Sequence, residues 1–329
     1  MKAENILEQL EELDDNKPIE DILRKRKPRQ SLTRRTPKKP PKRDQVFIHT
    51  QSDRVSNLQF TYKAARFEES WLLESLGFFY EQHWISDVIR KVKVGKEASV
   101  YLCRSGEHVA APFVAAKVYR PRMLRNLRDD HLYREGRTIL DEDGKPILDL
   151  GMLKAQHKRT VYGEQIRHQS WIAHEFSALQ VLHHLQADVP RPYAMAHNAI
   201  LMGYLGDEHL SAPILSDVTL KTSEVGSIFK RILHNLDLLL ACERVHGDLS
   251  AYNILYWNGE ITLIDFPQVI SPHDNRNAYS IFKRDVARIC EYFIRQGLDL
   301  YPQRLAANLW QSHGFRLTPE IHPRLLEEE

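Results

Sequence analysis

Apolar residues recur with two different periods along this chain, and the change of period predicts its architecture. Residues 67–92 and 166–187 carry apolar side chains three and four positions apart, as helices with one buried face do. Short β-branched and aromatic runs within 94–120 predict an antiparallel hairpin and a third strand, and 193–196 and 199–205 predict two more. The pattern therefore predicts an α+β protein, in which a small five-stranded lobe with one main helix precedes a mostly helical lobe.

Composition and pattern together divide the chain into four parts. The pattern within residues 1–55 predicts an acidic amphipathic helix followed by a disordered basic tail. The pattern within residues 56–90 predicts a helical extension. Residues 91–206 form the expected small lobe, with a charged insertion at 120–166, and 207–329 form the second lobe. With 329 residues and 42% apolar content, the chain is long enough to bury a substantial core.

A strongly basic segment is hidden by the near-neutral net charge of +2. Residues 24–43 contain eleven Lys or Arg and no acidic residue, so the rest of the chain is net acidic. This tail has four prolines and few apolar residues, and it cannot bury enough surface to offset the entropy of ordering. Such a tail can contact RNA, a ribosomal subunit or an acidic protein surface through charge. The alternative is a solvated tail without a specific partner.

The cysteines and the apolar runs indicate a compartment. Cys103, Cys242 and Cys290 lie far apart without C-x-x-C spacing, which favours free thiols in a reducing environment. No run of eighteen apolar residues and no signal-peptide pattern occurs, so we expect neither a membrane span nor secretion. The sequence predicts a cytoplasmic protein.

Two buried charges of opposite sign are predicted in the small lobe. Lys117 lies within the apolar strand pattern, and Glu175 lies on the apolar face of the main helix between Ile172 and Leu179. Burying either ion alone is costly, and pairing the two resolves both problems. A lysine that extends its ammonium group to the surface is the alternative.

One predicted hairpin indicates a hard-oxygen site. Asn258 and Gly259 stand between two β-like runs, which is the strongest short signal for a two-residue hairpin. The register of such a hairpin brings Asp265 back beside Asn253. A carboxylate and an amide oxygen placed together suit Mg²⁺, with waters and phosphates as its other ligands. Asp248 lies five residues before Asn253 and is placed to act as a base.

The order of these features resembles that of protein kinases: glycine loop, strand lysine, helix glutamate, D-x-x-x-x-N and metal-binding aspartate. Several blocks together resemble the RIO family of atypical protein kinases, in particular its RIO1-like branch, over roughly residues 85–300. The blocks are VGKEASVY (94–101), AAKVYR (115–120), SWIAHEFSAL (170–179), LMGYLG (201–206), HGDLSAYNIL (246–255) and IDFPQ (264–268). Aminoglycoside and choline phosphotransferases share HGDL-x-x-x-NIL but have His-Pro-Gly before the asparagine, where this chain has Ser250, Ala251 and Tyr252.

This resemblance implies a bilobal protein-kinase-like fold and a role for each matching residue. Lys117 would hold the α- and β-phosphates of ATP, Glu175 would orient Lys117, and Asp248 would accept the proton of the substrate hydroxyl. Asn253 and Asp265 would hold Mg²⁺, or Mn²⁺ in its place. The other implied nucleotide contacts are Met202 as gatekeeper, the backbones of Gly203 and Leu205, Leu255 beneath the adenine, and Gly95, Lys96 and Ser99 at the phosphates.

The chain departs from ordinary protein kinases in ways that are typical of the RIO family. Gly247 stands where those enzymes have an arginine, and Pro267 stands where they have the glycine after Asp265 and Phe266. Only twenty positions separate Asp265 from Asp285, and no A-P-E block follows, so we expect a reduced activation segment. Asp285 is expected to brace the backbone around Asp248.

Three functions remain open from the sequence. The leading one is an ATP- and Mg²⁺-dependent serine/threonine kinase that phosphorylates itself and acts on or near a ribonucleoprotein. The first alternative is an ATPase-gated RNA or ribosome-assembly factor, in which Asp265 transiently takes the γ-phosphate. The second is a small-molecule phosphotransferase of the aminoglycoside or choline kinase type, for which a basic tail has little evident use.

Deleting residues 24–43 tests the basic tail. We expect ATP binding to stay nearly unchanged, while binding to RNA or ribosomes weakens and becomes less dependent on salt, because each lost phosphate contact removes counterion release. Binding measured across a salt series for both proteins checks this. Equal salt slopes for the full chain and the deletion would contradict the prediction.

Overall fold

The computed structural model describes residues 60–317 apart from 121–136, 142–143, 150, 153, 155–159 and 197. The predicted helix and basic tail within 1–55, and much of the insertion predicted at 120–166, therefore lie outside the described residues. Within the described part, no helix is long and apolar enough to cross a membrane.

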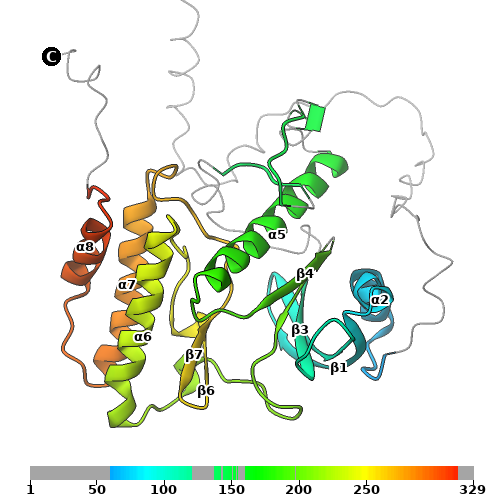
Figure 1. The fold of residues 1–329 in the computed structure, drawn as a ribbon, viewed down its shortest axis with the longest axis horizontal. Helices are drawn as coiled ribbons and strands as arrows, with labels where there is room; N and C mark the ends of the chain where they lie inside the picture. The colour runs from blue at the N-terminus through cyan, green and yellow to red at the C-terminus, as the bar shows by residue number, and fades with distance from the viewer. Residues whose placement is uncertain are drawn as a thin grey trace, which may run out of the picture. The chain divides into compact units, whose positions relative to one another are not determined.

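The small lobe is built on the five-stranded antiparallel sheet that the sequence predicts (Figure 1). Its strands are β1 (Ile85–Val94), β2 (Ala98–Ser105), β3 (Phe113–Tyr119), β4 (Pro192–Ala196) and β5 (Ala199–Gly203). The strand order is β1-β2-β3-β5-β4, so β3 lies in the centre of the sheet. Lys117 is therefore carried by the central strand, with neighbours on both sides.

Alternation along β3 gives the sheet two apolar faces, and a different helix covers each. On one face, Val114 and Val118 pack with Leu72 and Leu76 of α2 (Arg66–Glu81). On the opposite face, Tyr119 packs with residues of α5 (Val161–His184). Because side chains on a strand alternate, Lys117 shares the α5 face with Tyr119, and Glu175 on α5 can reach it.

The helix predicted at 67–92 is too long, and the predicted boundary between residues 90 and 91 falls inside β1. Helix α2 ends at Glu81, and β1 begins at Ile85. Three irregularities in the pairing of β1 with β2 interrupt the two-residue alternation. Ile85 and Val88 are consequently both buried although they are three positions apart. These bulges imitate helical spacing in the sequence.

The insertion ends earlier than residue 166, because α5 already begins at Val161. Thr160 caps this helix by accepting a hydrogen bond from the Gly163 N–H at 3.1 Å. The described part of the insertion forms a short hairpin, in which the Ile147 N–H donates to the Ile139 carbonyl at 2.8 Å. A short hairpin is one of the two forms expected for this segment.

The second lobe is mostly helical, as predicted, and contains α6 (Thr222–Ala241), α7 (Ala278–Arg295) and α8 (Pro302–Ser312). Phe229 of α6 and Phe293 of α7 place their ring centroids 5.0 Å apart. Two short strands, β6 (Ile254–Trp257) and β7 (Glu260–Leu263), form a separate hairpin. The protein therefore has the α+β architecture with a five-stranded lobe and a mostly helical lobe that the sequence predicts.

Asp188 joins the two lobes in the segment between α5 and β4. Its carboxylate accepts from Arg231 at 2.5 and 2.6 Å and from Asn235 Nδ2 at 2.6 Å, both on α6. The backbone of Asp188 also takes part, since its N–H donates to Asn235 Oδ1 at 2.7 Å and its carbonyl accepts from the Leu263 N–H at 2.7 Å. Asn235 is fully buried, and it satisfies both the backbone and the side chain of Asp188.

Replacing Asn235 with alanine should lower the free energy of unfolding by about 1–3 kcal/mol, because the partly buried N–H and carboxylate of Asp188 each then lose a hydrogen-bond partner. Urea denaturation followed by fluorescence measures this change. Lys230→Ala, an exposed position on the same helix, is the control and should shift stability by less than about 0.5 kcal/mol. Equal stabilities of the two variants would contradict a joining role for Asn235.

Candidate active site

Lys117 lies at the centre of a three-way ion pair that draws on both lobes. Its Nζ atom is 2.5 Å from Glu175 Oε1 and 2.6 Å from Asp265 Oδ1. Tyr119 donates its hydroxyl to the other oxygen of Glu175 at 2.6 Å. The lysine is 9% exposed and the glutamate 1% exposed, so the pairing predicted from the sequence is confirmed, and the surface alternative for Lys117 is wrong.

The charges in this cluster stabilise one another against the cost of burial. Burial disfavours the Lys117 ammonium, but the carboxylates of Asp265 and Glu175 outweigh it and raise the lysine pKa above its usual range. Partial burial likewise disfavours the Asp265 carboxylate, and the nearby Lys117 ammonium holds the pKa of that carboxyl below its ordinary value. Lys117 and Asp265 are therefore both charged at neutral pH.

The hairpin of β6 and β7 returns Asp265 to Asn253, as the sequence predicts. Asn258 and Gly259 have φ angles of 52° and 88°, the left-handed pair that a type I′ turn requires. The Ile264 N–H then donates to the Asn253 carbonyl at 3.0 Å. Asp265 itself has φ 72°, which is uncommon for a residue with a side chain and stores backbone strain at this point.

His246 fixes the start of the loop that carries Asp248. The ring is buried, its Nε2 atom donates to the Ile264 carbonyl at 3.2 Å, and its Nδ1 atom accepts from the Asp248 N–H at 3.3 Å. Burial lowers the histidine pKa, which agrees with a neutral ring that uses one nitrogen as donor and the other as acceptor. His246 thereby ties the Asp248 backbone to the strand end that precedes Asp265.

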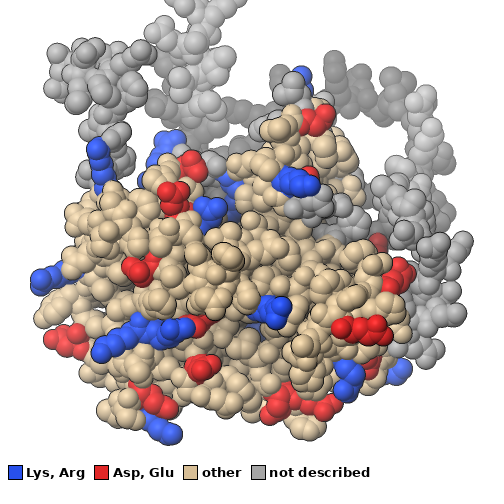
Figure 2. Space-filling model, in the orientation of Figure 1, with Lys and Arg blue, Asp and Glu red and all other residues tan. Residues whose placement is uncertain are grey.

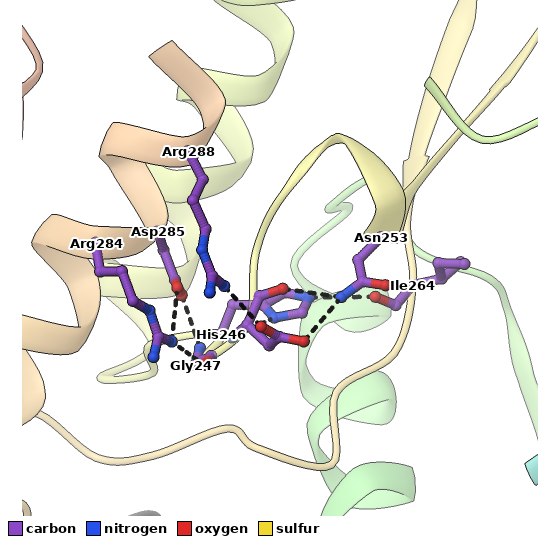
Figure 3. Close-up of polar contacts among 8 residues, drawn as sticks. His246, Gly247, Asn253, Ile264, Arg284, Asp285 and Arg288 are labelled. Atoms are coloured by element: carbon purple, nitrogen blue, oxygen red, sulfur yellow. Dashed lines mark hydrogen bonds and ion pairs between the residues drawn. The ribbon is translucent and has the colours of Figure 1, made fainter. Parts of the chain in front are cut away.

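Gly247 is required by the backbone and cannot be replaced by the arginine of ordinary protein kinases. Its φ of 87° is left-handed, and an added Cβ would lie 2.2 Å from the Gln268 carbonyl oxygen. The Gly247 N–H donates to Asp285 Oδ2 at 2.9 Å, and its carbonyl accepts from Arg284 (Figure 3). This confirms the bracing role expected for Asp285.

Asp248 and Asn253 face each other across their short loop. The Asn253 Nδ2 atom donates to the Asp248 carbonyl at 2.8 Å and to Asp248 Oδ2 at 3.4 Å (Figure 3). The amide nitrogen is thus turned toward Asp248, which leaves the Asn253 oxygen as the atom that can bind a cation. Asp248 Oδ1 accepts from Arg288 Nη1 of α7 at 2.7 Å.

The oxygen donors of Asn253 and Asp265 fit a magnesium ion. Mg²⁺ is commonly bound through one or two protein oxygens and completes its octahedron with waters and phosphate oxygens. The described residues contain no group of three or more His, Cys, Asp or Glu that could hold a metal by themselves. With Asn253 and Asp265 as its protein ligands, Mg²⁺ would take its remaining ligands from waters and phosphate oxygens.

Part of the backbone after Met202 is engaged within the protein. The Gly203 N–H donates to the Arg191 carbonyl at 2.8 Å, and the Leu205 carbonyl accepts from the Ala212 N–H at 2.9 Å. The contacts of the Gly203 and Leu205 backbones with adenine stay predictions.

The other residues predicted to bind the nucleotide lie on three separate parts of the fold. Met202 lies on β5 and packs in the same cluster as the α5 face of the sheet, and Leu255 lies half-buried on β6. Gly95 and Lys96 lie in the turn between β1 and β2, where the Gly95 N–H donates to the Ala98 carbonyl at 2.8 Å. Their roles in binding remain predictions.

The Ser99 side chain cannot take the predicted phosphate contact. Val100, not Ser99, pairs with Lys117 across the sheet, so the side chain of Ser99 points to the opposite face. There it is buried beside Tyr101, which packs in the α2 cluster. Only the backbone of Ser99 remains able to contact a nucleotide on the Lys117 side.

Three arginines at this site were missed by the sequence analysis. Arg284 and Arg288 lie one turn apart on α7 and bind the Gly247 carbonyl and the Asp248 carboxylate. Arg137, in the insertion, donates to the carbonyls of Pro267 and Val269 at 3.1 and 2.7 Å. The four-residue spacing of Arg284 and Arg288 beside Asp285 was the one available signal.

The comparisons with known proteins agree with this geometry. The RIO domain family matches residues 150–305. The serine/threonine-protein kinase RIO1 of Chaetomium thermophilum is 31% identical over 67% of this chain and 42% of its own length. The RIO-type serine/threonine-protein kinase Rio1 of Haloferax volcanii is 30% identical over 63% of each chain. The chain thus spans less than two thirds of the length of these relatives.

A solved structure of the Rio2 kinase–ADP/Mg²⁺–phosphoaspartate complex from Chaetomium thermophilum aligns with 78% of this chain and 76% of its own, at 19% identity and a TM-score of 0.49. The matched RIO domain covers α5, the loop of Asp248 and the metal-binding hairpin. The curated RIO1 matches extend over about two thirds of the chain. This chain is therefore similar to the RIO family, and both curated relatives named above are RIO1 proteins.

Proposed function

We propose that this protein is an ATP- and Mg²⁺-dependent RIO-type serine/threonine protein kinase that also phosphorylates itself. The observation that carries the proposal is the buried contact of Lys117 with both Glu175 and Asp265. It joins the phosphate-binding lysine of one lobe to the metal-binding aspartate of the other, and Asp248 and Asn253 lie alongside. The RIO1 relatives support the same activity.

Each residue of the site has a task in phosphoryl transfer. Lys117 binds the α- and β-phosphates, held in place by Glu175, and the Gly203 carbonyl and Leu205 N–H bind the adenine edge. Asn253 and Asp265 hold Mg²⁺, which when bound neutralises charge on the β- and γ-phosphates. Asp248 accepts the proton of the attacking hydroxyl.

A second activity, ATP hydrolysis through phosphorylation of Asp265, has one observation in its favour. The Asp265 side chain is 42% exposed although it contacts the buried Lys117, so a γ-phosphate can approach its carboxylate. Carboxylates act as phosphoryl acceptors in other enzymes. This activity would make the protein an ATPase-gated assembly factor.

The partner and compartment of the protein are proposed on separate grounds. On the face shown in Figure 2, basic side chains of the described residues are interspersed with acidic ones. The contact with RNA or a ribosomal subunit is proposed for residues 24–43, because this segment has many Lys and Arg and no acidic residue. A cytoplasmic location is supported by Cys103, Cys242 and Cys290, which are all free thiols.

Removing Lys117 alone and together with Glu175 distinguishes catalysis from packing. Lys117→Met should abolish phosphoryl transfer and lower the free energy of unfolding by about 3–5 kcal/mol, because it leaves Glu175 buried without its cation. The double variant Lys117→Met/Glu175→Leu should regain much of that stability while it stays inactive. Urea denaturation and ATP turnover measure the two effects. A double variant that is active, or no more stable than Lys117→Met, would contradict the assigned roles.

The chemistry of the labelled product tests kinase against ATPase. Protein incubated with γ-labelled ATP and Mg²⁺ should carry label mainly on serine, where a phosphoester resists neutral hydroxylamine, and Asp248→Ala should lose it. An aspartyl phosphate is a mixed anhydride that hydroxylamine cleaves. Asp265→Ala should be inactive under either mechanism. Label that is mainly hydroxylamine-labile and persists in Asp248→Ala would make the ATPase the principal activity.

A further inference from the structure

Arg288 presents a positive charge directly at the proposed catalytic base. Its Nη1 atom is 2.7 Å from Asp248 Oδ1, and the two side chains are 40% and 44% exposed, so a substrate can reach both. Figure 3 shows Arg288 extending from α7 toward the loop, one turn beyond Arg284. A guanidinium carries five N–H donors, and the contact with Asp248 uses only Nη1.

Phosphoryl transfer beside Asp248 requires a positive charge, and the loop that carries Asp248 does not supply one. The transferred phosphoryl group spreads negative charge over its oxygens, and it passes to a hydroxyl that is hydrogen-bonded to the Asp248 carboxylate. Two negative groups thus approach each other. The loop from His246 to Asn253 contains no lysine or arginine. Lys117 is already engaged by Glu175 and Asp265.

We propose that Arg288 is a catalytic residue that donates hydrogen bonds to the transferred phosphoryl group, an inference that rests on the proposed kinase function. The acceptor oxygen forms a bond to the γ-phosphorus as the bond from that phosphorus to the bridging oxygen breaks, and ADP leaves. The hydroxyl proton goes to Asp248. Arg288 remains charged throughout and stabilises the charge on the phosphoryl oxygens, as arginine residues do in other phosphoryl transferases.

Holding the loop in place does not account for Arg288, because other groups already do so. Arg284 donates to the Gly247 carbonyl, Asp285 accepts from the Gly247 N–H, and His246 binds the Ile264 carbonyl. An ion pair as exposed as that of Arg288 and Asp248 contributes little to folding. The remaining alternative is an inhibitory contact in which Arg288 blocks Asp248, and it predicts the opposite kinetic result.

Kinetics of the full chain with Arg288→Ala and Arg288→Lys test the proposal, with Arg295→Ala on the same helix as the matched control. Arg288→Ala should lower kcat about 100-fold or more, as loss of one stabilising donor does elsewhere, and change the KM for ATP by less than about threefold. Arg288→Lys should keep part of the activity, because it retains the charge but loses the planar fork. Arg295 is exposed and far along α7, so its variant should match the unchanged protein.

Chemical rescue separates a direct role from a structural one. Millimolar methylguanidinium should raise the kcat of Arg288→Ala by about tenfold and leave Arg295→Ala unchanged, because it restores the missing donors. An Arg288→Ala protein with activity within about threefold of the unchanged protein would overturn the proposal. A faster Arg288→Ala protein would also overturn the proposal, because it would indicate an inhibitory contact. A slower Arg288→Ala protein that is less stable and is not rescued by methylguanidinium would overturn it as well. If the unchanged protein transfers no phosphoryl group at all, the proposed function itself fails.

Discussion

The buried charge of Lys117 is the constraint on which the rest of the site depends. An ammonium group in the centre of an apolar sheet is tolerated only with carboxylates beside it, and the fold supplies one from each lobe, Glu175 on α5 and Asp265 after β7. Electrostatics thereby fixes the helix against the sheet and brings the hairpin of β6 and β7 to the same point. The lobes are joined a second time at Asp188, whose backbone and side chain are both bound by Asn235.

The loop of Asp248 is held mainly through its backbone, which leaves its side chains available for chemistry. Asp285 binds the Gly247 N–H, Arg284 binds the Gly247 carbonyl, and His246 binds the carbonyl before Asp265. These partners come from a helix distant in sequence and from the neighbouring strand end. A neutral histidine and a left-handed glycine are what make such close backbone contacts possible here. The loop is thus positioned by contacts within the protein itself.

The parts of this site that sequence predicted are those governed by local geometry. A two-residue turn at Asn258 fixes the register that returns Asp265 to Asn253, and a lysine in an apolar strand requires a partner such as Glu175. The errors arose where a local pattern has two meanings. Bulges gave β1 the apolar spacing of a helix. Ser99 was assigned to the phosphates because it lies near Gly95 in the sequence, although strand alternation places its side chain on the face of the sheet opposite Lys117. The spacing of Arg284 and Arg288 marks one face of α7, but no local pattern indicates that this face contacts Asp248, because the contact joins elements distant in sequence.

Strain at Asp265 and charge at Arg288 together suggest why this site works with a short activation segment. Ordinary protein kinases use a long segment to position the metal-binding aspartate and to supply positive charge near the acceptor. Here the left-handed backbone of Asp265 is held by the hydrogen bond from the Ile264 N–H to the Asn253 carbonyl and by the ion pair of Asp265 with Lys117. The positive charge beside Asp248 comes from α7 instead, which is packed into the core through Val286 and Ile289. Asp265 and Arg288 are thereby both carried by elements of the packed core, since Ile254 and Leu263 of the hairpin belong to the same cluster.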